Sequence, residues 1–78
     1  MSDVILYTRA GCHLCDDAKR VLRDNGVAFA EVDIDTEADL RSRFNEEVPV
    51  VFIGGRKAFK YRVDPRELRQ RLERENTG

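Results

Sequence analysis

The feature that most constrains this fold is a change of hydrophobic period at two cysteines, Cys12 and Cys15. The residues just before them, 4–8, are all apolar or β-branched, which predicts a buried strand. From Leu14 onward, apolar residues recur at helical spacing as far as Gly26, which predicts a helix closed by a glycine cap. The cysteines therefore lie where a strand passes into a helix.

A second strand and a second helix follow. Residues 27–34 predict a strand, and the helix between the two strands implies a parallel, right-handed crossover. We expect Asp35 or Thr36 to cap the second helix, in which Leu40 and Phe44 lie four residues apart on one face. These segments complete a β-α-β-α unit.

The last part of the chain predicts a hairpin and a third helix. Pro49 excludes helix for the residue before it and precedes a third strand over residues 50–53. The glycine pair that follows predicts a tight turn, and residues 56–61 predict an antiparallel fourth strand. Asp64, followed by a proline and by an acid three positions on, predicts the start of a helix. The order is β-α-β-α-β-β-α: an α/β chain with a four-stranded mixed sheet and three helices.

Size and composition narrow the class of protein. The chain has 78 residues, enough for one domain, 1–78. Apolar residues make up 41% and the net charge is −1, which suits a small core and argues against a nucleic-acid partner. The longest apolar run, 48–53, is too short to cross a membrane, and the acidic start does not resemble a signal peptide. We expect a cytoplasmic monomer with no membrane partner.

The cysteine pair limits the chemistry more than any other feature. A disulfide between Cys12 and Cys15 closes a ring so small that it removes little entropy from the unfolded chain, so it is a poor structural staple. A stable disulfide is also out of place in a reducing cytosol. Redox chemistry, metal binding and two inert thiols remain, and C-x-x-C spacing beside a β-α-β unit favours redox chemistry.

The position of the pair predicts different roles for its two thiols. Cys12 precedes the first turn of the helix, where unpaired backbone N–H groups carry partial positive charge and stabilise a thiolate. Cys15 lies one turn inside the helix, close enough to attack a mixed disulfide on Cys12. We therefore predict Cys12 as the nucleophile and Cys15 as the resolving thiol.

Three other residues are candidates for the same site. His13 either stabilises the reduced pair as an imidazolium or faces solvent with little effect. Arg9, three residues before Cys12, either steers an anionic substrate or stabilises the thiolate, or it is simply one of 14 basic side chains on a charged surface. Pro49 either carries a cis peptide bond that brings backbone groups to the thiols or has the far commoner trans bond.

Charge is divided unevenly along the chain. Residues 1–53 carry 6 basic and 11 acidic side chains, whereas residues 54–78 carry 8 basic and 4 acidic ones. The basic half is either a surface for an acidic partner or a solvated last helix with internal Arg–Glu pairs. The pattern favours the solvated helix.

The chain resembles the glutaredoxin family of the thioredoxin fold over nearly all of its length. The resemblance rests on the segments LYTRAGCHLC, EVDID and EVPVVFIGG. It implies the thioredoxin/glutaredoxin fold, Cys12 and Cys15 as catalytic residues, and a cis Val48-Pro49 bond in a loop that faces them. The GCHLC motif and the VDPREL ending are most similar to a group of small bacterial glutaredoxin-like domains.

The resemblance also implies an activity and a substrate site. The activity is the reduction of protein disulfides or glutathione mixed disulfides in redox homeostasis, with glutathione or a protein reductase as electron donor and no required cofactor. The residues that correspond to substrate contacts are Arg9, His13, Leu14, Val48, Pro49 and Asp64.

Two departures from the family concern glutathione. His13 and Leu14 replace the proline and tyrosine of the usual C-P-Y-C motif, and residues 60–63 contain no glycine pair before Asp64. Both changes remove contacts that the family offers to glutathione. We predict that glutathione is a poor reductant here and that a protein partner serves instead.

Two other functions fit the same residues. Two chains can share an iron–sulfur cluster through four thiolates, which absorbs above about 400 nm. A zinc site is less suited, because one chain offers two cysteines and a histidine beside Cys12. A catalytically idle adaptor can bind a partner through the Val48-Pro49 groove, and it would retain its function without Cys12.

Overall fold

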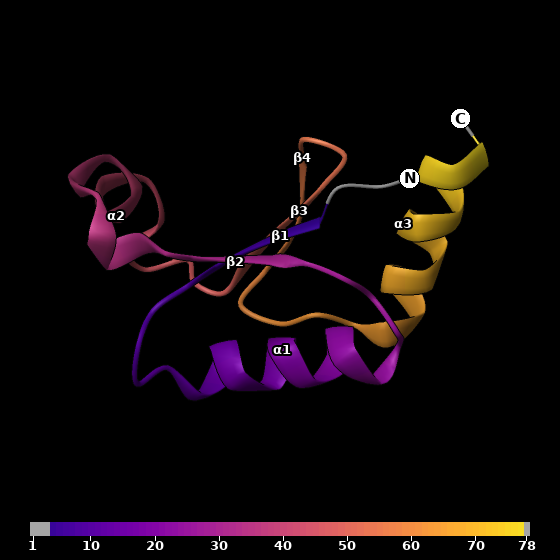
Figure 1. Ribbon diagram of the computed structural model, residues 1–78, viewed down its shortest axis with the longest axis horizontal. Helices are drawn as coiled ribbons and strands as arrows, with labels where there is room; N and C mark the ends of the chain where they lie inside the picture. The colour runs from indigo at the N-terminus through magenta and orange to yellow at the C-terminus, as the bar shows by residue number, and fades with distance from the viewer. Residues whose placement is uncertain (1–3, 78) are drawn as a thin grey trace.

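The computed structural model describes residues 4–77 and, in the last helix, side chains as far as residue 74. In chain order the elements are β1 (Val4–Thr8), α1 (His13–Asp24), β2 (Ala30–Asp33), the 3₁₀ turn η1 (Ile34–Thr36), α2 (Ala38–Phe44), β3 (Val50–Ile53), β4 (Arg56–Lys60) and α3 (Pro65–Thr77) (Figure 1). The ends of the predicted domain, residues 1–3 and 78, lie outside the described residues. No helix in the described part of the chain is long and apolar enough to span a membrane.

The four strands form one mixed sheet in the order β2-β1-β3-β4. β1 runs parallel to β2 and antiparallel to β3, and β3 pairs with β4 in antiparallel fashion. Gly54 and Gly55 turn the chain between β3 and β4, both with the positive φ that a tight hairpin turn requires. This topology confirms the predicted α/β class with a four-stranded mixed sheet and three α-helices.

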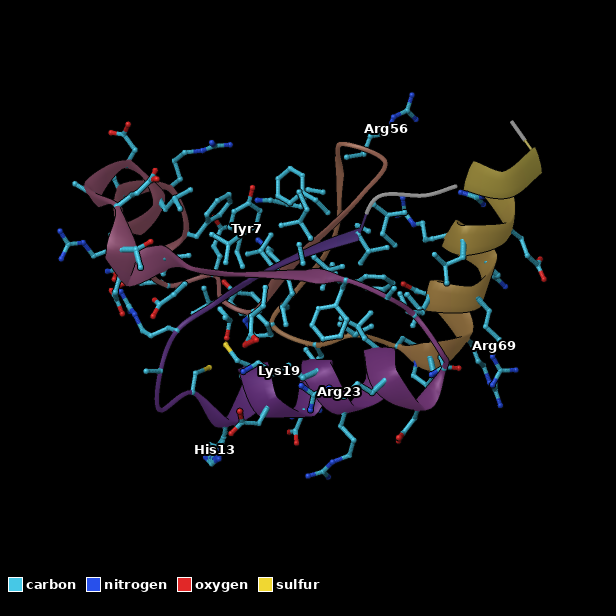
Figure 2. All side chains as sticks on the ribbon, viewed as in Figure 1. Tyr7, His13, Lys19, Arg23, Arg56 and Arg69 are labelled. Carbon is cyan, nitrogen blue, oxygen red and sulfur yellow. The ribbon has the colours of Figure 1, made fainter. Side chains whose placement is uncertain are left out.

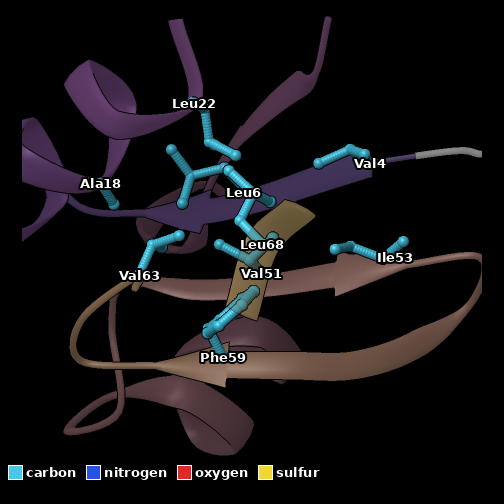
Figure 3. Close-up of a cluster of buried hydrophobic side chains, with 9 residues drawn as sticks. All are labelled: Val4, Leu6, Ala18, Leu22, Val51, Ile53, Phe59, Val63 and Leu68. Atoms are coloured by element: carbon cyan, nitrogen blue, oxygen red, sulfur yellow. The ribbon is translucent and has the colours of Figure 1, made fainter. Parts of the chain in front are cut away.

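The larger core lies on the face of the sheet that packs against α1 and α3. Residues of β1 alternate between the two faces, so Val4 and Leu6 point into this core while Tyr7 points to the other side. Nine buried residues form it, and Figure 3 shows them: Val4, Leu6, Ala18, Leu22, Val51, Ile53, Phe59, Val63 and Leu68. Ala18 and Leu22 belong to α1, and they pack against strand residues of the same cluster. This core therefore holds α1 against the sheet.

The opposite face has a smaller core, to which η1 and α2 contribute. Its buried members are Ile34, Phe44 and Val50, and the partly buried residues around them are Tyr7, Leu40, Val48 and Phe52. Tyr7 stacks on Phe44 with ring centroids 4.7 Å apart, and Phe52 meets both rings edge-on. These aromatic contacts hold the short helix α2 to the sheet.

Two strands are shorter than predicted. β2 begins at Ala30, three residues late, because the Val27 N–H donates to the Leu22 carbonyl at 2.9 Å and thereby completes the end of α1. β4 ends at Lys60, because Tyr61 has a φ of 69° and leaves the strand conformation. A hydrogen bond at the end of α1 and a left-handed backbone at Tyr61 therefore override strand-like composition at these two places.

The predicted cap of the second helix is wrong. Asp35 and Thr36 lie in η1, where the Asp33 side chain accepts a hydrogen bond from the Asp35 N–H at 2.8 Å. α2 begins after Glu37, whose side chain forms no cap hydrogen bond. The extra turn has a packing reason, because it places Ile34 in the smaller core.

Candidate functional site

Strand register brings the loops that carry the predicted site residues to one end of the sheet. Tyr7, near the end of β1, pairs with Val50 at the start of β3, and Val50 pairs with Lys60 at the end of β4. The loop that follows β1 leads to Cys12, and the loop that precedes β3 contains Pro49. Neighbouring strands lie about 4.8 Å apart, so these loops leave the sheet side by side.

Cys12 is the N-cap residue of α1. Its backbone is extended, with φ −97° and ψ 112°, and its Sγ accepts a hydrogen bond from the Cys15 N–H at 3.4 Å. Its carbonyl accepts the Asp16 N–H at 3.2 Å. The thiol is free and only partly buried. The sulfur of Cys12 therefore faces a helix N-terminus, whose N–H groups favour negative charge.

Cys15 lies one turn further along α1 and is a free thiol with 0% of its surface exposed. Burial penalises the thiolate and is the main reason that the pKa of Cys15 is raised. The hydrogen bond and the charge of Cys12 raise this pKa further. The pair thus consists of an accessible thiol at the helix start and a buried thiol behind it.

Thr8 provides a polar group beside Cys15 that the sequence motifs do not indicate. Its hydroxyl is buried and has no well-formed hydrogen bond to any described group. It nevertheless lies close enough to the thiol to lower the pKa of Cys15, against the larger effect of burial. The sequence indicates the burial of Thr8 only through the alternation of side chains along β1. Thr8 lies two residues after Leu6, so both side chains point to the α1 face, and both are buried.

The loop before β3 is held from two sides. The Val48-Pro49 peptide bond is cis. The carbonyl of Pro49 accepts a hydrogen bond from the Tyr61 N–H at 2.9 Å, which joins the loop to the end of β4. Val48 packs against the smaller core. The backbone of this loop is therefore anchored to two separate elements.

Arg9 is bound within the protein. Its Nε and Nη2 donate to the two carboxylate oxygens of Asp35 at 3.1 and 3.0 Å, and Nη1 and Nη2 donate to the backbone and side-chain oxygens of Asn45 at 3.1 and 2.7 Å. The hydrogen-bonded ion pair raises the pKa of Arg9 and lowers the pKa of Asp35. These bonds connect the loop before Cys12 to η1 and to the end of α2. A contact between Arg9 and substrate stays a prediction.

The remaining predicted contacts lie at helix starts. Figure 2 shows His13, the first residue of α1, projecting away from the sheet. Leu14 beside it is partly buried. Asp64 precedes α3, and its Oδ1 accepts the Arg66 N–H at 2.8 Å, as expected of a helix cap. Substrate contacts by His13, Leu14 and Asp64 stay predictions.

A polar pocket of about 340 Å³ lies between β1, β2 and α1. It is lined by Thr8, Arg9, Ala10, Lys19, Glu31 and Asp33. The Nζ of Lys19, one turn after Cys15, lies 2.5 Å from Glu31 Oε1 and 3.9 Å from Asp16 Oδ1. Glu31 is the main reason that the pKa of Lys19 is raised, and a Cys15 thiolate adds to it. Lys19 was not among the predicted site residues. The sequence indicates it only through its position four residues after Cys15, which places both side chains on one face of the helix.

A metal site was one of the alternatives left open by the cysteines. Among the residues that the structure describes, no three histidine, cysteine, aspartate or glutamate side chains come together as a metal ion requires. The described part of one chain therefore offers no complete zinc site.

Comparison with known proteins places the chain in a family. The family described as glutaredoxin-like domain (DUF836) matches residues 3–73. A glutaredoxin-like protein of Dictyostelium discoideum is 32% identical over 81 residues, which span 91% of this chain and 75% of that protein.

Solved structures agree with this family. The X-ray structure of a structural-genomics target protein from X. campestris is 37% identical, with a TM-score of 0.81 over 91% of this chain and 96% of that one. Glutaredoxin 1 from Francisella tularensis is 26% identical, with a TM-score of 0.65 over the whole of both chains. Together with the strand-to-helix cysteine pair, these matches show that the chain belongs to the glutaredoxin-like family of the thioredoxin fold.

Proposed function

We propose that this protein is a thiol–disulfide oxidoreductase in which Cys12 is the nucleophile and Cys15 the resolving thiol. A thiol-redox role in general follows from the family and from the neighbouring cysteines. The asymmetry of the pair carries the finer proposal. A partly exposed sulfur accepts a hydrogen bond at the start of α1, and a fully buried thiol lies one turn behind it.

The reaction has two exchange steps. The Cys12 thiolate attacks one sulfur of the substrate disulfide, a bond to Cys12 forms, the substrate S–S bond breaks, and the departing thiolate takes a proton. Cys15 then loses its proton and attacks the Cys12 sulfur, which forms the Cys12–Cys15 disulfide and releases the other substrate thiolate, which is protonated in turn. Overall, the substrate gains two electrons and two protons from the cysteine pair. An external thiol reductant then supplies two electrons and two protons to the Cys12–Cys15 disulfide and restores both thiols.

The proposed substrates are protein disulfides or glutathione mixed disulfides, with a protein reductase rather than glutathione as the donor. Residues 60–63 contain no glycine pair to form a carboxylate-binding nest. Arg9 directs four of its five N–H donors to Asp35 and Asn45. Each missing contact to a charged ligand is worth about 1.5–3 kcal/mol, so the affinity for glutathione is expected to be low.

Cys12→Ser and Cys15→Ser test the assignment as a matched pair. Cys12→Ser is expected to abolish reduction of insulin disulfides and of a glutathionylated peptide. Cys15→Ser is expected to stop after the first step and to retain the substrate on Cys12, seen as a mass increase that dithiothreitol reverses. Full activity of Cys12→Ser contradicts the assignment of Cys12 as the nucleophile. Absence of activity in the wild type itself favours a binding adaptor.

The electron donor is tested by comparing two complete reducing systems. Turnover of the glutathionylated peptide is measured with glutathione and glutathione reductase, and then with thioredoxin reductase. A C-P-Y-C glutaredoxin assayed alongside is the control. Comparable rates of the two proteins with millimolar glutathione contradict the proposed donor.

Absorbance of the anaerobically purified protein above about 400 nm would instead indicate an iron–sulfur cluster shared by two chains.

A further inference from the structure

Tyr61 differs from the other described residues in two respects. Among residues 4–77 it is the one non-glycine residue with a positive φ, 69°, and the one large hydrophobic residue that is exposed, at 44%. A left-handed backbone is uncommon for a residue with a bulky ring. Such conformations persist where the surrounding structure imposes them, and they cluster at functional sites.

Two backbone hydrogen bonds hold Tyr61 in this conformation. Its N–H donates to the Pro49 carbonyl at 2.9 Å, and the Arg62 N–H donates to the Lys60 carbonyl at 2.8 Å. The resulting turn is tied to the proline loop, at the end of the sheet from which the Cys12 loop also leaves. Because the ring stays exposed, burial of the side chain does not explain the turn.

The surroundings of Tyr61 are basic. The Nζ of Lys60 lies 5.4 Å from the centre of the Tyr61 ring. Residues 60–66 contain three basic side chains, Lys60, Arg62 and Arg66, and one acidic one, Asp64, whose carboxylate already accepts a backbone N–H of α3. The nearby Glu47 carboxylate lies 3.7 Å from the Lys60 Nζ. A partner that approaches the thiols from this side therefore meets an aromatic ring within an excess of positive charge.

We propose that Tyr61 determines substrate specificity by binding the segment beside the reacting cysteine of a disulfide-bonded protein, and that Lys60 favours segments that pair an apolar residue with an acidic one. The inference rests on the proposed oxidoreductase function and names its substrate class. Tyrosine offers a large contact area at a small cost in conformational entropy. Basic groups around the contact favour encounter with acidic segments.

The test uses short peptides whose single cysteine carries thionitrobenzoate, so that release of the colour reports the first exchange step. One peptide has leucine and aspartate beside the cysteine, a second has glycine in place of leucine, and a third has lysine in place of aspartate. Tyr61→Asn removes the ring and tolerates the left-handed backbone, and Tyr61→Phe keeps the ring. Hydroxyethyl disulfide serves as a small substrate without flanking residues.

In single turnovers of the reduced protein, Tyr61→Asn is expected to lower the second-order rate constant for the leucine–aspartate peptide about tenfold, mainly by raising the half-saturating peptide concentration, and to leave that for the small disulfide unchanged. Tyr61→Phe is expected to match the wild type. Equal activity of Tyr61→Asn and wild type on this peptide overturns the inference. An equal loss on the peptide and on the small disulfide also overturns it, because that result indicates a general structural effect.

Lys60→Gln tests the charge, since Glu47 keeps its contact with Lys57 at 3.2 Å in this variant. It is expected to reduce the preference for aspartate over lysine and to weaken the dependence of that preference on salt. An unchanged preference overturns the role of Lys60. Cys12→Ser separates the two proposals: if both this variant and the wild type reduce the small disulfide no faster than the uncatalysed reaction, the oxidoreductase function itself fails, whatever Tyr61 does.

Discussion

The two faces of the sheet are built differently, and the loops that carry the candidate site leave the sheet at one end. Among the described residues, the hydrophobic cluster on the α1 face has nine buried members, whereas the cluster on the opposite face has three and depends on ring contacts to the seven-residue helix α2. Cys15 is buried in α1, and Val48 packs on the smaller core. The comparison shows that the buried Cys15 thiol belongs to the extensively packed face and the proline loop to the lightly covered one.

The largest expected effect comes from truncating one leucine on each face. Leu22→Ala is expected to lower the free energy of unfolding by about 2–5 kcal/mol, because Leu22 is fully buried in the larger core. Leu40→Ala is expected to cost less than half as much, because Leu40 is partly exposed. Urea titrations measure both values. Equal losses would contradict the difference between the faces.

The next effect concerns the pH dependence of the proposed second exchange step. In a mixed disulfide of Cys12 with thionitrobenzoate, the charge of Cys12 is absent, but burial still raises the pKa of Cys15. Only the thiolate of Cys15 attacks, so release is expected to accelerate about tenfold per pH unit and to keep rising beyond the ordinary thiol value of about 8.5. Stopped-flow absorbance measures the release. A plateau below about pH 8 would count against the buried resolving thiol.

Thr8→Val separates packing from chemistry on the α1 face. Valine has nearly the same shape and removes a hydroxyl without a well-formed hydrogen bond, so the free energy of unfolding is expected to stay constant or rise by up to about 1 kcal/mol. Because this hydroxyl lowers the pKa of Cys15, the variant is expected to release thionitrobenzoate a few-fold more slowly at neutral pH. Thr8→Ser is the control, since it keeps the hydroxyl. Release at the wild-type rate would show that the hydroxyl does not act on Cys15.

The smallest effect concerns the link between the cysteine loop and the lightly covered face. Asp35→Asn removes one charge of the Arg9–Asp35 pair, and a modest drop in Tm at neutral pH is expected because both groups are partly exposed. The pKa of Asp35 is lowered in the folded protein, so the pair stabilises it above the ordinary carboxyl pKa and this contribution is lost as pH falls through the lowered value. The Tm values of variant and wild type should therefore converge in acid. A difference that persists there would mean that the charge is not the cause.

The sequence by itself determined the order of the elements and the place of the thiols. Regular spacing of apolar residues predicted the strands and helices, the glycine pair predicted the hairpin turn, and Asp64 predicted the start of α3. Cys12 at the start of a helix with Cys15 one turn behind follows from the same spacing. These features are readable because each depends on hydrogen bonds and periodicity within a few consecutive residues.

Only the tertiary structure decided which groups surround the thiols. The Thr8 hydroxyl affects Cys15 because β1 and α1 pack together, and Arg9 is bound to Asn45, 36 positions away along the chain. The conformation of Tyr61 likewise depends on a hydrogen bond to the carbonyl of Pro49 in another loop. No local pattern shows these contacts, because each joins residues that are brought together by strand register and core packing rather than by their neighbours in sequence.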